Sequence, residues 1–340
     1  MKLLIITQKV DINDPILGFF HRWIEEFSKH AESLTVICLY KGEYHLPANV
    51  KVLSLGKEKG GHKVFLKIKY LRNFYKYIWS ERKKYDKVFV HMNQEYILFG
   101  WKVWKLLGKN IYMWRNHHSG SFLTDIAAFF CKKVFCTSKF SYTAKYKKTV
   151  LMPVGVDIKN FRHIESIKRI PSGVLSLGRI SPSKHVDLLV DVIVKINNPK
   201  ILVNVYGDPL PQDENYYQEL KDKSVNFIKF NKGIKNTETV AVYSAHDIFV
   251  NLSSSGMYDK TIFEAMACGC LILASNENLR GQIGDDFIFK EGDIEELALK
   301  LKKLLNYNEE ERKKAIQQLR VFAEGHNLEK LGEGLFAEIK

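Results

Sequence analysis

The sequence predicts an α/β protein made of two doubly wound, mostly parallel sheets that face each other across a cleft. Short apolar runs alternate with segments of helical periodicity in both halves of the chain, the pattern of parallel sheets covered by helices. The chain has 340 residues, 46% of them apolar, which is enough for two cores. A polar stretch at residues 165–172 ends in Pro171 and has the composition of a linker. We therefore predict one domain over residues 1–165 and a second over residues 166–322.

Positive charge is concentrated in the first half. Residues 1–165 carry 29 Lys and Arg against 13 Asp and Glu, while the whole chain has a net charge of +14. A basic domain predicts an anionic partner, such as lipid headgroups, a phosphorylated acceptor or nucleic acid. The sequence contains no nucleic-acid recognition motif, so we expect no nucleic-acid partner.

Hydropathy and cysteine content indicate a cytoplasmic protein. No apolar run approaches the ~20 residues that a membrane-spanning helix requires, and the apolar part of residues 1–8 is too short for a signal peptide. The five cysteines lie within apolar runs, as is typical of buried free thiols in a reducing compartment.

The first domain opens with a predicted strand at residues 3–7, a loop, and a helix that begins after Gly18. Gly18 would allow a ligand to approach the backbone closely, or it is part of an ordinary strand–helix loop. Another strand, at residues 111–114, is followed by His117 and His118. The carboxyl end of a parallel strand is where ligands bind in such sheets, although a surface histidine pair without function is the plainer interpretation. Further strands are predicted at residues 34–39, 50–53, 87–91 and 134–136, and a helix at 96–107.

Residues 62–85 predict a long basic helix. Its apolar stripe runs at helical spacing, while lysines and arginines fall on other faces and aromatic residues lie between them. The helix is either part of the domain with a solvated basic face, or, with its flanks at residues 57–87, a patch that docks on an anionic membrane. The stripe consists of Val64, Ile68, Leu71, Tyr75 and Ile78.

The second domain begins with a predicted strand at residues 173–177. It runs into a turn with Gly178, Arg179 and Lys184, and an amphipathic helix follows. Cations beside a glycine turn suit a diphosphate, because arginine offers a planar fork and lysine a point charge. The alternative is a solvated turn. A later strand, at residues 201–208, ends in Gly207.

Residues 249–275 read as strand, small polar loop, helix and strand. The loop meets the N-terminus of the helix predicted at residues 260–267, where free N–H groups and the helix dipole favour a phosphate. Lys260 and Glu264 are four residues apart and can share one face. On this pattern alone, an ordinary turn with a surface Glu–Lys pair is an equally good interpretation.

Two of these segments resemble a known family. Residues 263–269, FEAMACG, are similar to the "EAMA-x-G" signature of retaining GT-B glycosyltransferases of family four (glycosyl transferases group 1), and residues 178–184 match its "GR-x-x-x-x-K". The family usually has a second Glu where this chain has Gly256. A subset carries small residues and an Asp-Lys dipeptide instead, here Asp259 and Lys260. The resemblance implies a GT-B fold of two Rossmann-like domains and a terminal helix, residues 323–340, that crosses back to the first.

The resemblance also implies roles for individual residues. Arg179 and Lys184 would neutralise a departing diphosphate, and Glu264 would bind the ribose of the donor. His117, with His118 in reserve, would lie beside the sugar and acceptor. The catalytic residues that the resemblance implies are His117, Arg179 and Lys184. The donor-binding residues that it implies are Gly18, Gly178, Arg179, Lys184, Gly207, Gly256, Asp259, Lys260, Thr261 and Glu264.

The expected activity is that of a hexosyltransferase (EC 2.4). It would move a sugar from a UDP- or GDP-linked donor to a hydroxyl of a glycan or lipid-linked acceptor, with retention. We expect no metal and no cofactor, since Asp-x-Asp is absent and the cations could stabilise the leaving group. The setting would be cell-surface polysaccharide or glycolipid synthesis, at the inner face of the membrane. The alternatives are an epimerase- or phosphorylase-type GT-B enzyme, or a non-enzymatic module that binds anionic polymers or membranes.

Overall fold

The computed structural model describes residues 1–60 and 63–340, and the chain forms two compact units. The first unit is Met1–Gly155 with Leu328–Lys340, and the second is Val156–Asn327. The sequence placed the first boundary at residue 165, whereas residues 156–165 make contacts within the second unit. The backbone N–H of Ile164, for example, donates to the Ser244 hydroxyl at 3.0 Å.

The first unit contains a parallel sheet whose strand order is β3-β2-β1-β4-β5-β6-β7. The interior strand β1 carries apolar side chains that point alternately to its two faces, and most of them are buried. β1 pairs with β2 on one side and with β4 on the other. The strands are β1 (Lys2–Val10), β2 (Ser33–Lys41), β3 (Val50–Ser54), β4 (Lys87–His91), β5 (Asn110–Trp114), β6 (Lys133–Cys136) and β7 (Thr149–Leu151).

Helices cover both faces of this sheet. Leu3 and Ile5 belong to a cluster with α1 (Phe19–His30) and α11 (Leu328–Ile339). Leu4 and Ile6 belong to the opposite cluster, with α2 (Lys63–Ser80), α3 (Glu95–Leu106) and α4 (Phe122–Phe130). The C-terminal helix α11 is therefore part of the core of the first unit.

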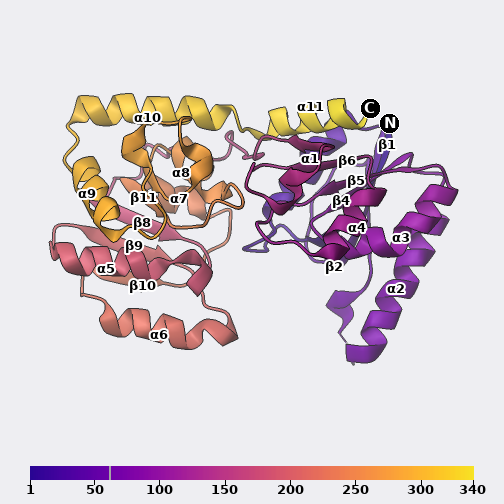
Figure 1. Ribbon diagram of the computed structural model, residues 1–340, viewed down its shortest axis with the longest axis horizontal. Coiled ribbons are helices and arrows are strands. Elements are labelled where there is room, and N and C mark those ends of the chain that lie inside the picture. The colour runs from indigo at the N-terminus through magenta and orange to yellow at the C-terminus, as the bar shows by residue number, and fades with distance from the viewer. Residues whose placement is uncertain (61–62) are drawn as a thin grey trace. The chain divides into compact units, whose positions relative to one another are not determined.

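The second unit contains a parallel sheet of order β10-β9-β8-β11-β12. One face is covered by α5, which packs against α6 and α9, and the other by α8, which packs against α7 and α10 (Figure 1). The strands are β8 (Gly173–Leu177), β9 (Leu202–Tyr206), β10 (Ile228–Asn231), β11 (Ile248–Asn251) and β12 (Leu271–Ala274). The helices are α5 (Val186–Ile196), α6 (Glu214–Lys223), α7 (Thr239–Ser244), α8 (Lys260–Ala267), α9 (Ile294–Leu305) and α10 (Glu309–Glu324).

The buried face of α2 differs from the stripe that helical spacing predicted. Phe74 and Ile78 are the buried side chains, and Phe74 packs against the Trp104 ring. Ile78 of the predicted stripe is therefore confirmed as buried, whereas Ile68, Leu71 and Tyr75 are exposed. The physical reason is that the apolar arc of α2 is wide, and only the part that holds Phe74 and Ile78 packs into the core. Residues 61 and 62 of the predicted segment, and the side chain of Val64, lie outside the described residues.

In the described part of the chain, no helix is long and apolar enough to span a membrane. All five cysteines are buried free thiols, which confirms that part of the prediction.

Candidate functional site

The candidate site lies at the point where the strand order of the second sheet reverses. β8 and β11 are neighbours, but the chain leaves β8 towards β9 and leaves β11 towards β12. Loops from adjacent strands therefore diverge at the carboxyl edge, which opens a crevice there. A pocket occupies this position, and its lining includes Gly178, Arg179, Lys184, Ser253 and Asp259.

Gly207, which directly follows the neighbouring strand β9, packs closely against the turn after β8. A Cβ atom at Gly207 would lie 1.9 Å from the carbonyl oxygen of Gly178. The two turns are also joined by backbone hydrogen bonds, from Gly178 N to Tyr206 O at 3.0 Å and from Ile180 N to Asp208 O at 3.2 Å. Gly207 therefore supports the pocket by close backbone contact and does not line it.

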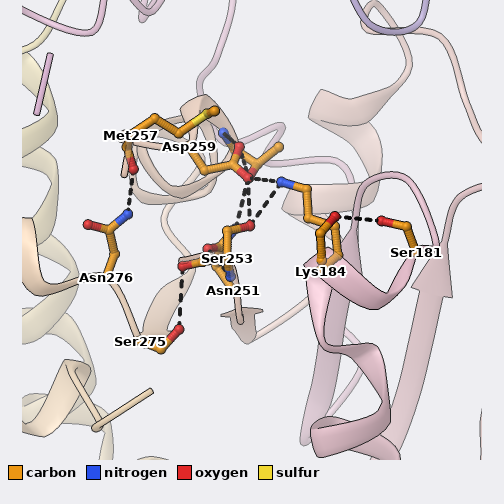
Figure 2. Close-up of polar contacts among 10 residues, drawn as sticks. Ser181, Lys184, Asn251, Ser253, Met257, Asp259, Ser275 and Asn276 are labelled. Carbon is orange, nitrogen blue, oxygen red and sulfur yellow. Dashed lines mark hydrogen bonds and ion pairs between the residues drawn. The ribbon is translucent and has the colours of Figure 1, made fainter. Parts of the chain in front are cut away.

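The two cations of this turn have different surroundings. Arg179 is exposed, and among the described residues it has no hydrogen-bond or ion-pair partner. The Lys184 ammonium instead lies 2.7 Å from Asp259 Oδ2 and 2.9 Å from the Ser253 hydroxyl (Figure 2). Arg179 is thus available to an anion without breaking an internal contact.

Asp259 is the centre of a polar network at the start of α8. Its Oδ1 accepts hydrogen bonds from the hydroxyl and N–H of Thr261, at 2.9 and 3.3 Å, so Asp259 is the N-cap of the helix. Its Oδ2 also accepts from Ser253 at 3.0 Å and from Asn251 at 3.4 Å. Burial alone would raise the pKa of Asp259, but the Lys184 charge and these hydrogen bonds outweigh burial and hold the pKa well below its usual range.

One turn further along α8, Glu264 is buried beside Lys260. The Tyr243 hydroxyl donates a hydrogen bond to Glu264 Oε2 at 3.1 Å. Burial raises the pKa of Glu264 and lowers the pKa of Lys260, and the attraction between the two charges opposes both shifts. A carboxyl and an amine with displaced pKa values at a strand–helix junction are typical of functional sites.

The loop between β11 and α8, which contains Gly256, is held by the segment after β12. The Asn276 amide donates to Met257 O at 2.7 Å (Figure 2), and the Asn278 amide donates to Ser255 O at 2.7 Å. Gly256 is buried within this loop. These amides stabilise the loop shape that presents the N-terminus of α8.

The remaining predicted residues belong to the first unit. Gly18 precedes α1, and a Cβ there would lie 2.5 Å from Asp14 O, so the tight turn before the helix requires glycine. The His117 ring stacks on His118 with centroids 4.4 Å apart, and its Nδ1 accepts from Ser119 N at 3.0 Å. Burial, then the neighbouring charges of His118 and Arg115, lowers the pKa of His117.

Of the nine predicted residues of the second unit, Gly178, Arg179, Lys184 and Asp259 line the pocket. Thr261 binds Asp259, and Lys260 and Glu264 lie in the same helix. Gly207 supports the turn after β8, and Gly256 lies in the loop before α8. Gly18, His117 and His118 form loops after β1 and β5 of the other sheet. Sequence reasoning missed Asn251, Ser253 and Tyr243. Ser253 and Asn251 stand at the end of an apolar run, which is a usable signal, but nothing in the sequence distinguishes Tyr243. Within residues 1–60 and 63–340, no group of three or more His, Cys, Asp or Glu side chains is placed to hold a metal ion.

Comparison with known proteins finds similarity over the second unit. Residues 157–321 match the family described as glycosyl transferases group 1. Alpha-monoglucosyldiacylglycerol synthase of Streptococcus pneumoniae is 27% identical over 188 residues, which cover 48% of this chain and 41% of that protein. Sulfoquinovosyl transferase SQD2 of Arabidopsis thaliana is 28% identical over 176 residues, 46% of this chain and 32% of that protein. The matched segment thus spans about two fifths of the first of these relatives and about a third of the second.

Solved structures show the fold of the whole chain. Anabaena HepE in complex with UDP superposes with a TM-score of 0.78 at 16% identity, over 98% of both chains. Sucrose-phosphate synthase from Thermosynechococcus elongatus superposes with a TM-score of 0.76 at 16% identity, over 98% of this chain and 97% of that one. At this identity the likeness establishes the fold, which is GT-B, as the sequence predicted.

Proposed function

Because residues 157–321 match the glycosyl transferases group 1 family, we propose that this chain transfers a hexosyl unit from a UDP- or GDP-linked sugar to a hydroxyl acceptor. The observation that carries the proposal is the pocket at the reversal of the second sheet, where Arg179 and Lys184 meet the N-terminus of α8. Nucleotides bind at this position in doubly wound sheets. The relatives' names describe sugar transfer, which agrees with the proposal.

The reaction needs stabilisation of the negative charge that develops on the departing nucleoside diphosphate. The exposed guanidinium of Arg179 and the Lys184 ammonium supply fixed positive charge, and N–H groups at the start of α8 add to it. Because protein cations can take this role, we propose that transfer does not depend on a divalent metal. Glu264 is proposed to accept hydrogen bonds from the ribose hydroxyls, since a carboxylate can accept two at once.

The remaining features are carried over from the family resemblance. The proposed outcome is retention of the anomeric configuration, by attack on the face from which the diphosphate leaves. His117 is proposed to act beside the sugar and Gly18 to allow the backbone near it. We propose a glycan or lipid-linked acceptor in cell-surface polysaccharide or glycolipid synthesis, which agrees with a relative named for a diacylglycerol glycolipid.

An exposed face of the first unit supports work at an anionic membrane surface. On α2, Ile68, Tyr75 and Trp79 are 63%, 39% and 49% exposed and follow helical spacing on one side. Lys67 and Lys76 are exposed on the same helix. The neighbouring helices α3 and α4 also expose apolar side chains, namely Phe99, Leu106, Phe122 and Phe129. A surface that mixes aromatic and basic side chains is the type that binds anionic headgroups, and we propose that residues 57–87 carry this contact on the cytoplasmic side.

The transferase proposal is tested by incubating the chain with labelled UDP- and GDP-sugars and candidate acceptors, with and without EDTA. Labelled product should form only when an acceptor is present, and it should still form in the presence of EDTA. NMR of the product should show that the anomeric configuration of the sugar is retained. Arg179→Ala should lower kcat by a factor on the order of 10² to 10³, while Arg280→Ala, another exposed arginine, should not change it. A product without acceptor would indicate an epimerase. A requirement for inorganic phosphate would indicate a phosphorylase.

The membrane proposal is tested separately by flotation with vesicles. Vesicles of phosphatidylcholine with phosphatidylglycerol should carry the chain upward, and phosphatidylcholine alone should not. The pair Ile68→Ser and Trp79→Ser should abolish flotation, whereas Leu299→Ser, which is 69% exposed in the second unit, should leave it unchanged. Equal flotation with both kinds of vesicle, or none, would refute the proposal.

A further inference from the structure

We propose that Asp259 is a positioning residue for Lys184 and does not itself contact the donor. The inference rests on the proposed function, because Lys184 is taken to face the donor diphosphate. It replaces the donor-binding role that the resemblance gives to Asp259.

The hydrogen-bond capacity of Asp259 is already filled. A carboxylate offers about four acceptor positions. Lys184, Ser253 and Asn251 donate to Oδ2, and the hydroxyl and N–H of Thr261 reach Oδ1. A sugar hydroxyl would therefore have to displace one of these donors before it could bind Asp259.

Charge also argues against direct contact with the donor. The carboxylate is ionised and its neighbours stabilise the ionised form, so a phosphate oxygen beside it would meet a like charge with no proton to share. The group that can meet the phosphate is the cation that Asp259 holds. An ammonium has three N–H donors. Two of those on Lys184 are used by Asp259 and Ser253, and no third partner is found within the described residues.

Asp259 also fixes the position of Lys184 relative to α8. The same carboxylate caps α8 through Thr261 and binds Lys184, which belongs to the turn after β8. Glu264 lies one turn further along that helix. One side chain therefore sets the spacing between the cation for the diphosphate and the carboxylate for the ribose.

A double-mutant cycle tests this role, with UDP and GDP as titrants in isothermal calorimetry on the full chain. Asp259→Asn removes the charge but keeps an oxygen that can cap the helix. Lys184→Met is made in the wild-type and in the D259N chain. Within each background, the repulsion between residue 259 and the nucleotide is the same with and without the K184M substitution. It therefore cancels when the two losses of affinity caused by K184M are compared.

The cycle gives a distinct result for each role of Asp259. If Asp259 positions Lys184, K184M should weaken nucleotide binding about tenfold or more in the wild-type chain and less than about threefold in the D259N chain. Equal losses in both backgrounds would mean that Asp259 acts independently of Lys184. A larger loss in the D259N chain would mean that Asp259 only competes with the nucleotide for Lys184. Either result overturns the proposal.

Two further measurements keep the test decisive. If the wild-type chain binds neither UDP nor GDP, the proposed function fails and this inference with it, an outcome unlike those of the cycle. If D259N melts well below the wild type, Asp259→Ser takes its place, because serine also caps a helix but carries no carboxylate for Lys184. D259S should also reduce the cost of K184M, and an unchanged cost would contradict the proposal.

Discussion

The Tyr243 hydroxyl donates a hydrogen bond to the Glu264 carboxylate across 3.1 Å, inside the core of the second unit. Tyr243 is fully buried in α7 and Glu264 is 5% exposed in α8. The contact joins two helices on the same face of the sheet and fixes one oxygen of a carboxylate that has little access to water. The orientation of Glu264 therefore depends on a residue in another helix.

Removing this hydroxyl tests how far Glu264 depends on it. Tyr243→Phe should lower the free energy of unfolding by about 1–3 kcal/mol, because a buried acceptor loses its donor. It should also raise the pKa of Glu264 further, since the hydrogen bond favours the ionised form. Urea denaturation measures the first effect. Tyr217→Phe, whose hydroxyl has no partner among the described residues, is the control and should leave the midpoint unchanged.

Acid titration should reveal the network around Asp259. Its pKa in the folded chain lies below the usual value of 3.8, so the unfolded chain binds more protons near that pH. The stabilisation from the ionised carboxylate is complete above pH 3.8 and is lost as the pH falls through the folded value. The stability difference between wild type and Asp259→Asn, from urea curves, should be constant from pH 5 to 7 and shrink below pH 3.8. A difference that grew on acidification would refute this sign.

Gly207→Ala tests the close contact between the turns after β9 and β8. The new methyl group would lie 1.9 Å from Gly178 O, so the backbone of one turn must move. We expect a loss of stability of about 1–3 kcal/mol or more, as for other overpacked sites, with loss of UDP or GDP binding in calorimetry. Gly334→Ala in α11 is the matched control, because its nearest neighbour is the flexible end of Met152 at 3.2 Å. Unchanged nucleotide binding in G207A would show that the turn tolerates displacement.

Phe336→Ala tests the contribution of α11 to the first unit. The Phe336 ring is 2% exposed and lies 6.0 Å from that of Phe27 in α1. Truncation should cost about 3–5 kcal/mol, as for other buried phenylalanines. Hydrogen exchange should increase in α1 and β1 but not in β11 and β12. Leu299→Ala, in an exposed position of α9, should change neither.

In the second unit, the sequence predicted the local structure but not the contacts between distant residues. The bounds of α8 agree with the predicted helix because capping, helical spacing and a glycine stop are all local signals. The ion pair between Lys184 and Asp259 is not local. It joins residues 75 positions apart, and it forms only because β8 pairs with β11. Tyr243 was missed for a related reason, since a tyrosine in a short apolar helix carries no sign of the carboxylate that it meets.

The helix α2 shows the opposite limitation. Its spacing predicted a helix, which ends at Ser80 and not at residue 85. Of the predicted stripe, Ile78 is buried and Leu71 is exposed. The apolar arc of α2 is wide, so periodicity could not decide which part of it is buried. The decision came from the sheet, which accepts Phe74 and Ile78 and leaves Ile68 and Tyr75 exposed.

The packing of α11 on α1 has a consequence for biosynthesis. Ribosomes make α1 early, and α11 is made only after the whole of Val156–Asn327. The apolar side of α1, which includes Phe27, therefore stays unpacked until α11 is made, whereas the second unit can already fold. Domains of nascent chains usually mature from the N-terminus onward. In this chain we expect the opposite order, because the first unit needs α11, which is made last.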